Sequence, residues 1–491
     1  MKSLIAPPDF VPCIFPVRQY DCASRKPLRT SLSTTFDSSS SAVASRPPGR
    51  GKLLQVLGMW FGIAAAIGNT IAAGIVAAQG YIAALLPNVW LFLGVWILGG
   101  IYALLGASSL AELGAAIPRS GGQYNYSRRA LGEYAGFIVG WSDWLSTCGT
   151  NAVVALVIGN YSGVLFPNLA GHDAMIGVAV LLGFAILQWR GIKWGSAAQL
   201  LTAALKTGAF LILVIACFIL GGKAHAANVA STSADVALPS GWLLAAGFMM
   251  ALQKVIYTVD GWDGVIYFGE EVKNPGRDVP RAIFGSVFSI TAIYFLLSAA
   301  VAYVVPMREI IDNGFALGTA ASRVFGNYGD PVIRSIMLVS LLSCINACQL
   351  FATRTLYAMS VGGLFFRAAS QVNKGGTPVL ALVLSTAVGM AFCIFQKFVR
   401  VIDMLAFFFV ANYTLSFISM FRMRMKEPEM PRPYRAWGYP WTPGLALISS
   451  ILFLAGAVYT DRVNTPWALG LLIASYPIFR AMKSFSRPAS G

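Results

Sequence analysis

The chain has 491 residues, of which 57% are hydrophobic and only 11% are charged. A soluble globular domain carries roughly 25% charged residues, so this composition excludes an ordinary soluble fold and requires contact with membrane lipid. The formal net charge of +16 would favour a nucleic acid partner in a soluble protein. In a membrane protein it indicates Lys and Arg in cytoplasmic loops, so we expect no nucleic acid partner.

The first 50 residues differ from the rest of the chain. They contain Pro7-Pro8, a serine run from Ser38 to Ser41 and scattered arginines. No long apolar core is followed by a small-residue cleavage site, which argues against a secretory signal. The Arg and Ser content weakly resembles a transit peptide, but the composition favours a disordered tail over residues 1–50. Residues 51–491 are then the membrane domain.

From Lys52 onward the chain contains about twelve continuous apolar runs, each near the ~20 residues that a helix needs to cross the hydrocarbon. Strands of a membrane barrel would instead alternate apolar and polar residues. The pattern therefore predicts an all-α polytopic membrane protein with twelve transmembrane helices. The expected spans are 54–78, 89–116, 134–164, 173–189, 195–221, 241–268, 282–305, 332–360, 378–396, 400–421, 442–460 and 465–482.

The charges of the loops predict the orientation of these helices. If the N-terminus lies inside, 18 Lys and Arg residues after residue 52 fall on the cytoplasmic side, and 7 fall on the opposite side. Cytoplasmic loops carry the excess of positive charge in membrane proteins. We therefore expect both termini in the cytoplasm, which agrees with an even number of spans.

Two of the spans contain polar and glycine residues in their middle. The first includes AIGNTIAAGIVAAQG at 66–80, and the sixth includes VIYTVDGWDGVIYFGEE at 255–271. Glycine weakens a helix by about 1 kcal/mol relative to Ala, and polar neighbours make an unwound stretch plausible. Interrupted segments at matching positions of two halves indicate the binding site of a transporter. The alternative is that these glycines serve only close packing of helices.

Spans one and six match if the first ten helices form two five-helix repeats of opposite orientation. The repeats would cover about 51–221 and about 238–422, followed by two extra helices over about 441–482. An opened helix supplies free N–H groups that suit a carboxylate and free carbonyls that suit an ammonium. An amino acid carries both groups close together, so it is the expected substrate.

Three motifs carry a resemblance to a known family. They are GWDGVIYFGEEVKNPGRDVPRA at 261–282, AELGAAIPRSGGQYNYSRRALGEYAGFIVGW at 111–141 and PEMPRPYRAWGYPWTP at 428–443. In order and spacing they resemble the amino acid–polyamine–organocation superfamily, and most of all its L-type amino acid transporter branch. The resemblance covers roughly residues 50–485. It implies a leucine-transporter-like fold of five plus five inverted helices with discontinuous helices 1 and 6, two added helices, and alternating access.

The resemblance also implies roles for individual residues. The substrate carboxylate would meet the backbone at 71–74, and its amino group would meet carbonyls at 257–259, with Tyr257 as an aromatic gate. Ala72 departs from the usual Gly-small-Gly motif, and its methyl group would narrow the pocket or impede the opening of the backbone. The expected substrate-binding residues are Ile71, Ala72, Ala73, Gly74, Tyr257, Thr258, Val259 and Asp260.

Lys206 lies about halfway along the fifth span. A Lys at the bilayer centre costs roughly 2.5–3.5 kcal/mol, so it should face a partner or a cavity. The resemblance implies that a fifth-helix Lys takes the place of a sodium ion, where it would bridge carbonyls of helices one and eight. We therefore predict sodium-independent transport with Lys206 as the internal cation and as a proton carrier. The alternative is a Lys that extends to the membrane surface without a role.

Other charges leave several interpretations open. Lys254 could attract an acidic substrate and so set specificity, pair with Asp260, or extend to the outer surface. Asp143 could pair with a neighbouring helix or contact the substrate, and Glu112 is expected to be structural. Asp260 and Asp263 could bond the freed N–H groups of the break. The mixed charges at 270–282 predict either an inner ion-pair network that opens with the gate or a solvated loop.

Other functions are weighed against transport. An intramembrane enzyme would need paired catalytic groups or a metal at membrane depth, whereas His172 and His225 fall in short external loops. Cys344 and Cys348 share a helix face without further metal ligands, so we expect no metal. Since no paired catalytic groups are visible either, we expect no cofactor and no enzyme activity. A non-transporting nutrient sensor remains an alternative. So does a polyamine or organic cation carrier, which should place an acidic residue in the distal pocket.

These patterns together predict a secondary active transporter that moves amino acids by alternating access. It would lie in the plasma membrane, work without sodium, and either couple to protons or exchange substrates. The amino acid carried and the oligomeric state are left open.

Overall fold

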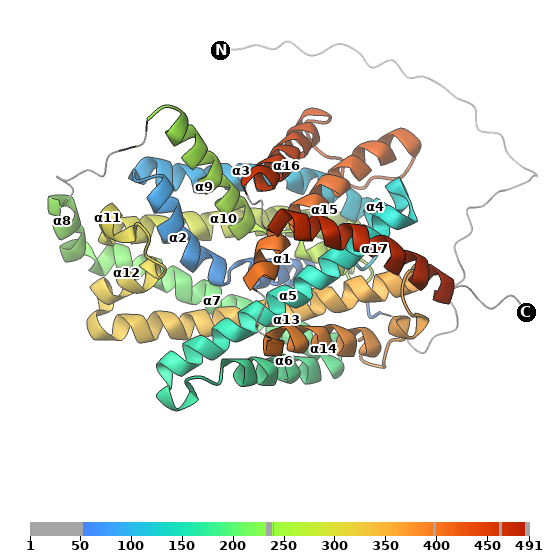
Figure 1. Cartoon of the computed structure of the whole chain (residues 1–491), viewed down its shortest axis with the longest axis horizontal. Helices are drawn as coiled ribbons and strands as arrows, with labels where there is room; N and C mark the ends of the chain where they lie inside the picture. Colours follow the sequence, from blue (N-terminus) through green and yellow to red (C-terminus); the bar gives the residue numbers. More distant parts are fainter. Residues whose placement is uncertain (1–52, 232–237, 239, 396–398, 461–463, 487–491) are drawn as a thin grey trace, which may run out of the picture. The chain divides into compact units, whose positions relative to one another are not determined.

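The computed structural model describes residues 53–231, 238, 240–395, 399–460 and 464–486, and every regular element in these ranges is a helix (Figure 1). The all-α prediction is confirmed there, and the predicted tail 1–50 lies outside the described residues. The first helices are α1 Met59–Thr70, α2 Ala73–Leu85, α3 Val89–Ala116, α4 Tyr124–Leu131, α5 Glu133–Leu165, α6 Asp173–Trp189, α7 Ile192–Leu220 and α8 Gly222–Ser231. The later ones are α9 Trp242–Val259, α10 Pro275–Val304, α11 Met307–Ile310, α12 Ala316–Phe325, α13 Gly329–Val361, α14 Val379–Phe395, α15 Val399–Lys426, α16 Trp441–Thr460 and α17 Asn464–Ser486.

A helix or a pair of helices lies over each of the twelve predicted spans. Among the described residues, 7 helices are long and apolar enough to cross a bilayer by themselves, or 8 if the bent pair α1 and α2 counts as one span. The apolar helices α6 and α14 have only 17 residues each. The chain is therefore a multi-pass membrane protein, while the number of twelve crossings stays a prediction.

The first predicted interruption is present. Helix α1 ends at Thr70 and α2 begins at Ala73, and the axes of Met59–Thr70 and Gly74–Leu85 differ by 51°. Between them Ile71 has φ −79° and ψ 86°, and Ala72 has φ −134° and ψ −145°, which are not helical values. The chain therefore leaves the helix for two residues and resumes in a new direction.

The second interruption is also present, and it is wider than the first. Helix α9 stops at Val259, well short of the predicted span end at 268, and only a 3₁₀ turn, η2 Gly264–Tyr267, follows before α10. Gly261 has a φ of +102°, a conformation that side-chain-bearing residues rarely adopt. A Cβ atom built at Gly261 would meet the Nδ2 atom of Asn69 and lie 2.9 Å from the Oγ1 atom of Thr70. The two breaks therefore touch.

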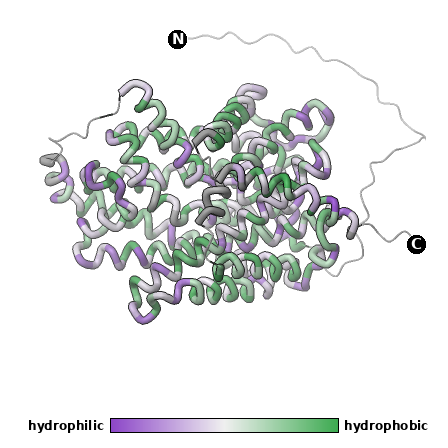
Figure 2. Tube along the Cα trace, viewed as in Figure 1, coloured by the Kyte–Doolittle hydropathy of each residue, from purple (hydrophilic) through white to green (hydrophobic). Residues whose placement is uncertain are grey.

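The outer faces of the helices suit lipid. Figure 2 shows hydrophobic residues along most of the helices and hydrophilic residues gathered mainly at helix ends and in loops. On α7, the side chains of Leu205, Ile212 and Ile219 are 54%, 67% and 73% exposed. An apolar stripe of this kind is unfavourable in water and is the usual surface of a helix in the hydrocarbon.

Helix α13 is central to the packing, and it contacts α5, α7, α1 and α14. A buried polar network ties it to two of its neighbours. The amide of Asn346 donates to Oε1 of Gln199 at 2.8 Å, and the amide of Gln188 donates to Oδ1 of Asn346 at 3.0 Å. Because buried polar groups must be hydrogen-bonded, this network fixes how α6, α7 and α13 lie against one another.

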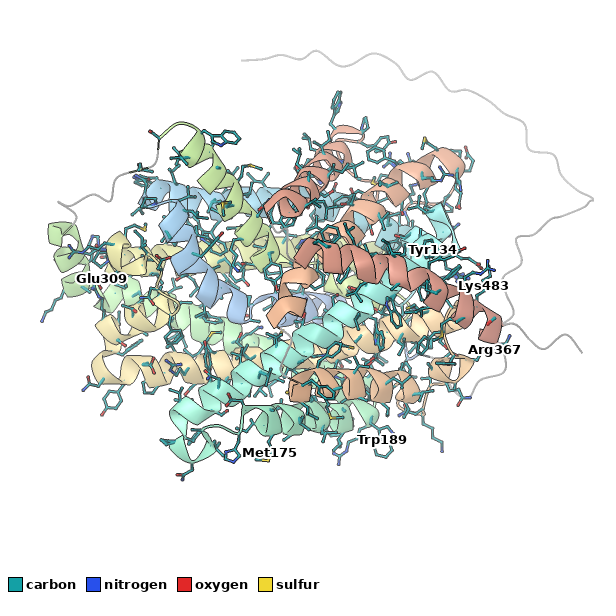
Figure 3. All side chains as sticks on the ribbon, viewed as in Figure 1. Tyr134, Met175, Trp189, Glu309, Arg367 and Lys483 are labelled. Atoms are coloured by element: carbon teal, nitrogen blue, oxygen red, sulfur yellow. The ribbon has the colours of Figure 1, made fainter. Side chains whose placement is uncertain are left out.

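Ion pairs join the helix ends on the side that the loop charges predict to be cytoplasmic. The carboxylate of Glu112 accepts hydrogen bonds from Arg424 and from the backbone N–H of Ala436, and it lies 3.1 Å from Arg432. This agrees with the structural role expected for Glu112. Lys483 of α17, which is labelled in Figure 3, pairs with Glu133 at the start of α5.

Candidate functional site

A cavity of about 150 Å³ lies where the two breaks meet. One water molecule needs roughly 10–15 Å³ on this measure, so the cavity is large enough for a small solute. Of the predicted substrate-binding residues, Ala72, Gly74, Tyr257, Thr258 and Asp260 line it. Ile71 and Val259 are buried next to these residues in the chain, and the main chain of Ala73 starts α2.

The first break offers main-chain N–H groups from only part of the predicted segment. The amide of Ile71 donates to the Ile67 carbonyl at 3.1 Å, and the amide of Ala72 donates to the Thr70 carbonyl at 2.9 Å. Helix α2 begins after them without a side-chain cap. The first N–H groups of a helix have no partner within it and carry partial positive charge, and in α2 these include the groups of Ala73 and Gly74.

Side chains occupy the carbonyl end of α1. Tyr294 donates its hydroxyl to the Thr70 carbonyl at 2.7 Å, and Ser340 of α13 donates to the Ile71 carbonyl at 2.5 Å. The same Tyr294 hydroxyl lies 3.3 Å from the Thr258 carbonyl of α9. Tyr294 therefore links the two breaks. The carbonyls of Thr70 and Ile71 already accept hydrogen bonds from side chains, so the first break has its N–H groups at the start of α2 to offer to a solute.

Lys206 is fully buried beneath this break. Its ammonium group donates to the Gly68 carbonyl at 3.0 Å and to the Ile71 carbonyl at 2.7 Å. A positive charge at the C-terminal end of a helix is stabilised by the helix dipole. The ammonium stands where a bound cation would cap α1, and a side chain extended to the membrane surface is excluded. The two carbonyls lie in the last turn of α1 and in the first break, whereas helix α13 contributes the Ser340 hydroxyl, which bonds the Ile71 carbonyl, instead of the predicted carbonyl.

The methyl group of Ala72 fits the structure without closing the cavity. It packs with Ala152, Ala155, Leu341 and Cys344 in a cluster between α5 and α13. The break forms although the first glycine of the usual motif is absent. The expected narrowing is therefore limited to one buried methyl group on the cavity wall.

Comparison with known families decides what kind of protein has this site. A family model described as "Amino acid permease" matches residues 54–478. The chain belongs to the amino acid permease family. It is 28% identical to the "Serine/threonine exchanger SteT" of Bacillus subtilis, over 88% of this chain and 97% of that protein. It is 25% identical to the human "Large neutral amino acids transporter small subunit 2", over 90% of this chain and 83% of that protein. These names are those of transporters and not of enzymes.

The rest of the cavity wall in this permease combines apolar residues, among them Val153, Val154 and Phe409, with polar and acidic ones. Helix α5 contributes Asp143, the segment after α9 contributes Asp263, and α15 contributes Asn412 and Tyr413. The sequence signals each of them as a polar residue within an apolar run. It could not show that they share one wall, because Asp143, Asp263 and the neighbours Asn412 and Tyr413 lie more than 100 positions apart in the chain, in segments whose packing is not local.

Lys254, the predicted specificity residue, is not among the described residues that line the cavity. Its ammonium group lies 5.9 Å from the ring centre of Tyr81 and 5.7 Å from that of Tyr257. These are cation–π distances. The side chain therefore packs on the aromatic rings of α2 and α9, and the charged residues on the cavity wall are the aspartates instead.

Two side-chain pairs that the sequence did not reveal lie at one end of the cavity, a pair of stacked rings and a buried ion pair. The rings of Tyr267 and Phe351 line the cavity and stack with centres 4.6 Å apart. One turn further along α13, Arg354 donates to both carboxylate oxygens of Glu271 at 3.0 and 3.2 Å, and both side chains are fully buried. Glu271 was predicted to pair within the charged segment 270–282, but its partner is on another helix.

Main-chain hydrogen bonds close the same region. The amide of Leu57 donates to the Glu271 carbonyl, and the amide of Lys273 donates to the Leu57 carbonyl, each at 2.9 Å. The segment before α1 is thereby joined to the segment after η2. Movement of either broken helix away from the other must separate these bonds.

Proposed function

We propose that this permease is a secondary active transporter that moves amino acids by alternating access. The cavity between two broken helices carries the proposal. The carboxylate would bind the free N–H groups of Ala73 and Gly74, and the ammonium would bind carbonyls of Tyr257, Thr258 and Val259 with Asp260 beside them. Ile71 and Ala72 would support the break, because their amides are already bonded. An amino acid presents both charged groups at the spacing of one carbon atom.

We propose twelve crossings in two inverted repeats, about 51–221 and about 238–422, with the last two helices over about 441–482. The match between the α1–α2 break and the α9–η2 break supports this arrangement. The charge of the loops supports cytoplasmic termini, and the plasma membrane is the proposed location. Alternating access would open one side by rocking the broken helices, with the Glu271–Arg354 pair as part of the inner closure.

Transport in this proposal needs no sodium, because the ammonium of Lys206 already occupies the carbonyl end of α1. Exchange of one amino acid for another is the proposed mode, since one relative is named as an exchanger. Proton coupling through Lys206 is the alternative mode. The partners of the protein are then an amino acid and the surrounding lipid.

Counterflow in liposomes tests the function. Purified protein in liposomes preloaded with unlabelled amino acids should accumulate a labelled amino acid from outside, and accumulation should be unchanged when choline replaces sodium. A nutrient sensor would bind the amino acid without counterflow. A polyamine carrier would respond to preloaded polyamine only. Either of these results would contradict the proposal, and loss of uptake in choline would contradict the role given to Lys206.

A further inference from the structure

The cavity has an acidic wall that binding of the amino acid backbone does not use. It is formed by Asp143 of α5 and Asp263 after α9, and Asp260, which the proposed function sets beside the α-ammonium, lines the same cavity. Asp143 and Asp263 are 6% and 2% exposed. Among the described residues that line the cavity, none is Lys, Arg or His.

Neutral groups hold these carboxylates in place. Asp143 accepts a hydrogen bond from the Tyr267 hydroxyl at 2.9 Å and another from the Thr355 hydroxyl at 3.0 Å. Asp263 accepts one from the amide of Gln123 at 2.9 Å. Such donors orient a carboxylate and satisfy part of its hydrogen-bonding capacity, but they supply no positive charge. These hydrogen bonds fix the positions of the two carboxylates but do not balance their negative charge.

The nearby basic side chains have other partners. Lys206 donates to carbonyls of the first break, and Arg354 pairs with Glu271. Lys254 lies against the rings of Tyr81 and Tyr257. A buried carboxylate without a paired cation is unfavourable. A mobile cation in the cavity would offset this cost, as would a proton on a carboxyl group.

Two unpartnered polar atoms give an independent sign of a ligand. The hydroxyl of Thr70 and the Nδ2 atom of Asn412 have no hydrogen-bond partner among the described residues. Both residues line the cavity, and they are 5% and 3% exposed. Buried polar groups in folded proteins are normally hydrogen-bonded. A solute with both donors and acceptors would supply the missing partners of these two atoms.

We propose that the acidic wall of Asp143 and Asp263 receives the positively charged side chain of a basic amino acid such as lysine, ornithine or arginine. This inference rests on the proposed function and names its substrate class. The two helix breaks hold the α-carboxylate and the α-ammonium, and the side chain reaches the acidic wall. Acidic amino acids are repelled, and diamines without an α-carboxylate leave the N–H groups of α2 unpaired.

Substrate competition in wild-type liposomes tests the inference without any variant. Lysine and norleucine have the same carbon chain and differ by the terminal ammonium group. We expect lysine, ornithine and arginine to drive counterflow and to compete at least about tenfold better than norleucine. If norleucine, serine or threonine drive counterflow while the basic amino acids neither enter nor compete, the inference is overturned and the proposed function stands. If cadaverine replaces lysine fully, or if no amino acid drives counterflow, both are overturned.

Isosteric variants assign the charge to the wall. Asp143→Asn and Asp263→Asn remove the negative charge with little change of shape. Asp263→Asn keeps an oxygen for the Gln123 amide, and Asp143→Asn keeps one for the Tyr267 or the Thr355 hydroxyl, while the other hydroxyl can accept from the new amide group. Each should lower kcat/KM for lysine at least about tenfold more than kcat/KM for norleucine. Asp330→Asn is the matched control, because Asp330 is a surface carboxylate paired with Arg334, and it should leave the ratio unchanged. An equal fall for both substrates in the cavity variants would overturn the assignment of the charge to these residues.

Discussion

Replacement of Lys206 by methionine should lower amino acid uptake at least about 100-fold. The ammonium donates to the Gly68 and Ile71 carbonyls, and hydrogen bonds that involve a charged group contribute about 1.5–3 kcal/mol each. The Ile71 carbonyl keeps its bond from Ser340, but the Gly68 carbonyl loses the donor that it has in this structure. Loss of both bonds therefore costs about 3 kcal/mol or more, and each 1.4 kcal/mol is a factor of ten. The lost bonds hold the break in the geometry that exposes the N–H groups of α2.

Lys193→Met is the matched control for this prediction. Lys193 is at the start of the same helix, α7, and its side chain is exposed. Initial rates of counterflow should be compared at equal amounts of inserted, monodisperse protein. If Lys206→Met transports as well as Lys193→Met, the ammonium of Lys206 does not hold the first break in its active form.

Replacement of Arg354 by methionine should destabilise the protein by about 3–5 kcal/mol, because it leaves the carboxylate of Glu271 buried and unpaired. Both side chains of this pair are 0% exposed, so water cannot replace the lost partner. The free energy of unfolding in detergent, followed by denaturant titration, measures the effect. The double variant Arg354→Met with Glu271→Gln should recover much of the loss, since it removes the unpaired charge.

Arg334→Met provides the comparison at the surface. Arg334 pairs with Asp330 one turn away at 2.7 Å, and the two side chains are 19% and 43% exposed. Such an i,i+4 pair contributes only about 0.3–0.5 kcal/mol. A loss of stability in Arg354→Met no larger than in Arg334→Met would show that the buried pair does not hold the inner closure.

The two breaks and the buried lysine could be predicted from the sequence because their signals are local. Glycine and polar residues at 68–74 and 260–264 stand out within apolar runs, and the depth of Lys206 follows from its place in one span. The extent of each break is less predictable. The amides of Ile71 and Ala72 remain bonded within the first break, and α9 ends at Val259 because of the backbone turn at Gly261.

The partners of buried charges could not be predicted, because they depend on how distant helices pack. Arg354 meets Glu271 across 83 positions of the chain, and Tyr267 meets Asp143 across 124. The sequence places Lys254 one turn before Tyr257 and so makes it a candidate specificity residue. In the structure it lies against aromatic rings, while acidic residues from α5 and from the segment after α9 line the cavity.

A structure of the purified protein with an amino acid bound, determined by electron cryomicroscopy in a lipid nanodisc, tests the central claim most directly. The account predicts density for the amino acid in the cavity between the breaks, with its carboxylate on the amides of Ala73 and Gly74 and its ammonium on the carbonyls of 257–259. Density for the solute at another place, or helices that run unbroken through residues 70–73 and 259–264, would contradict the account.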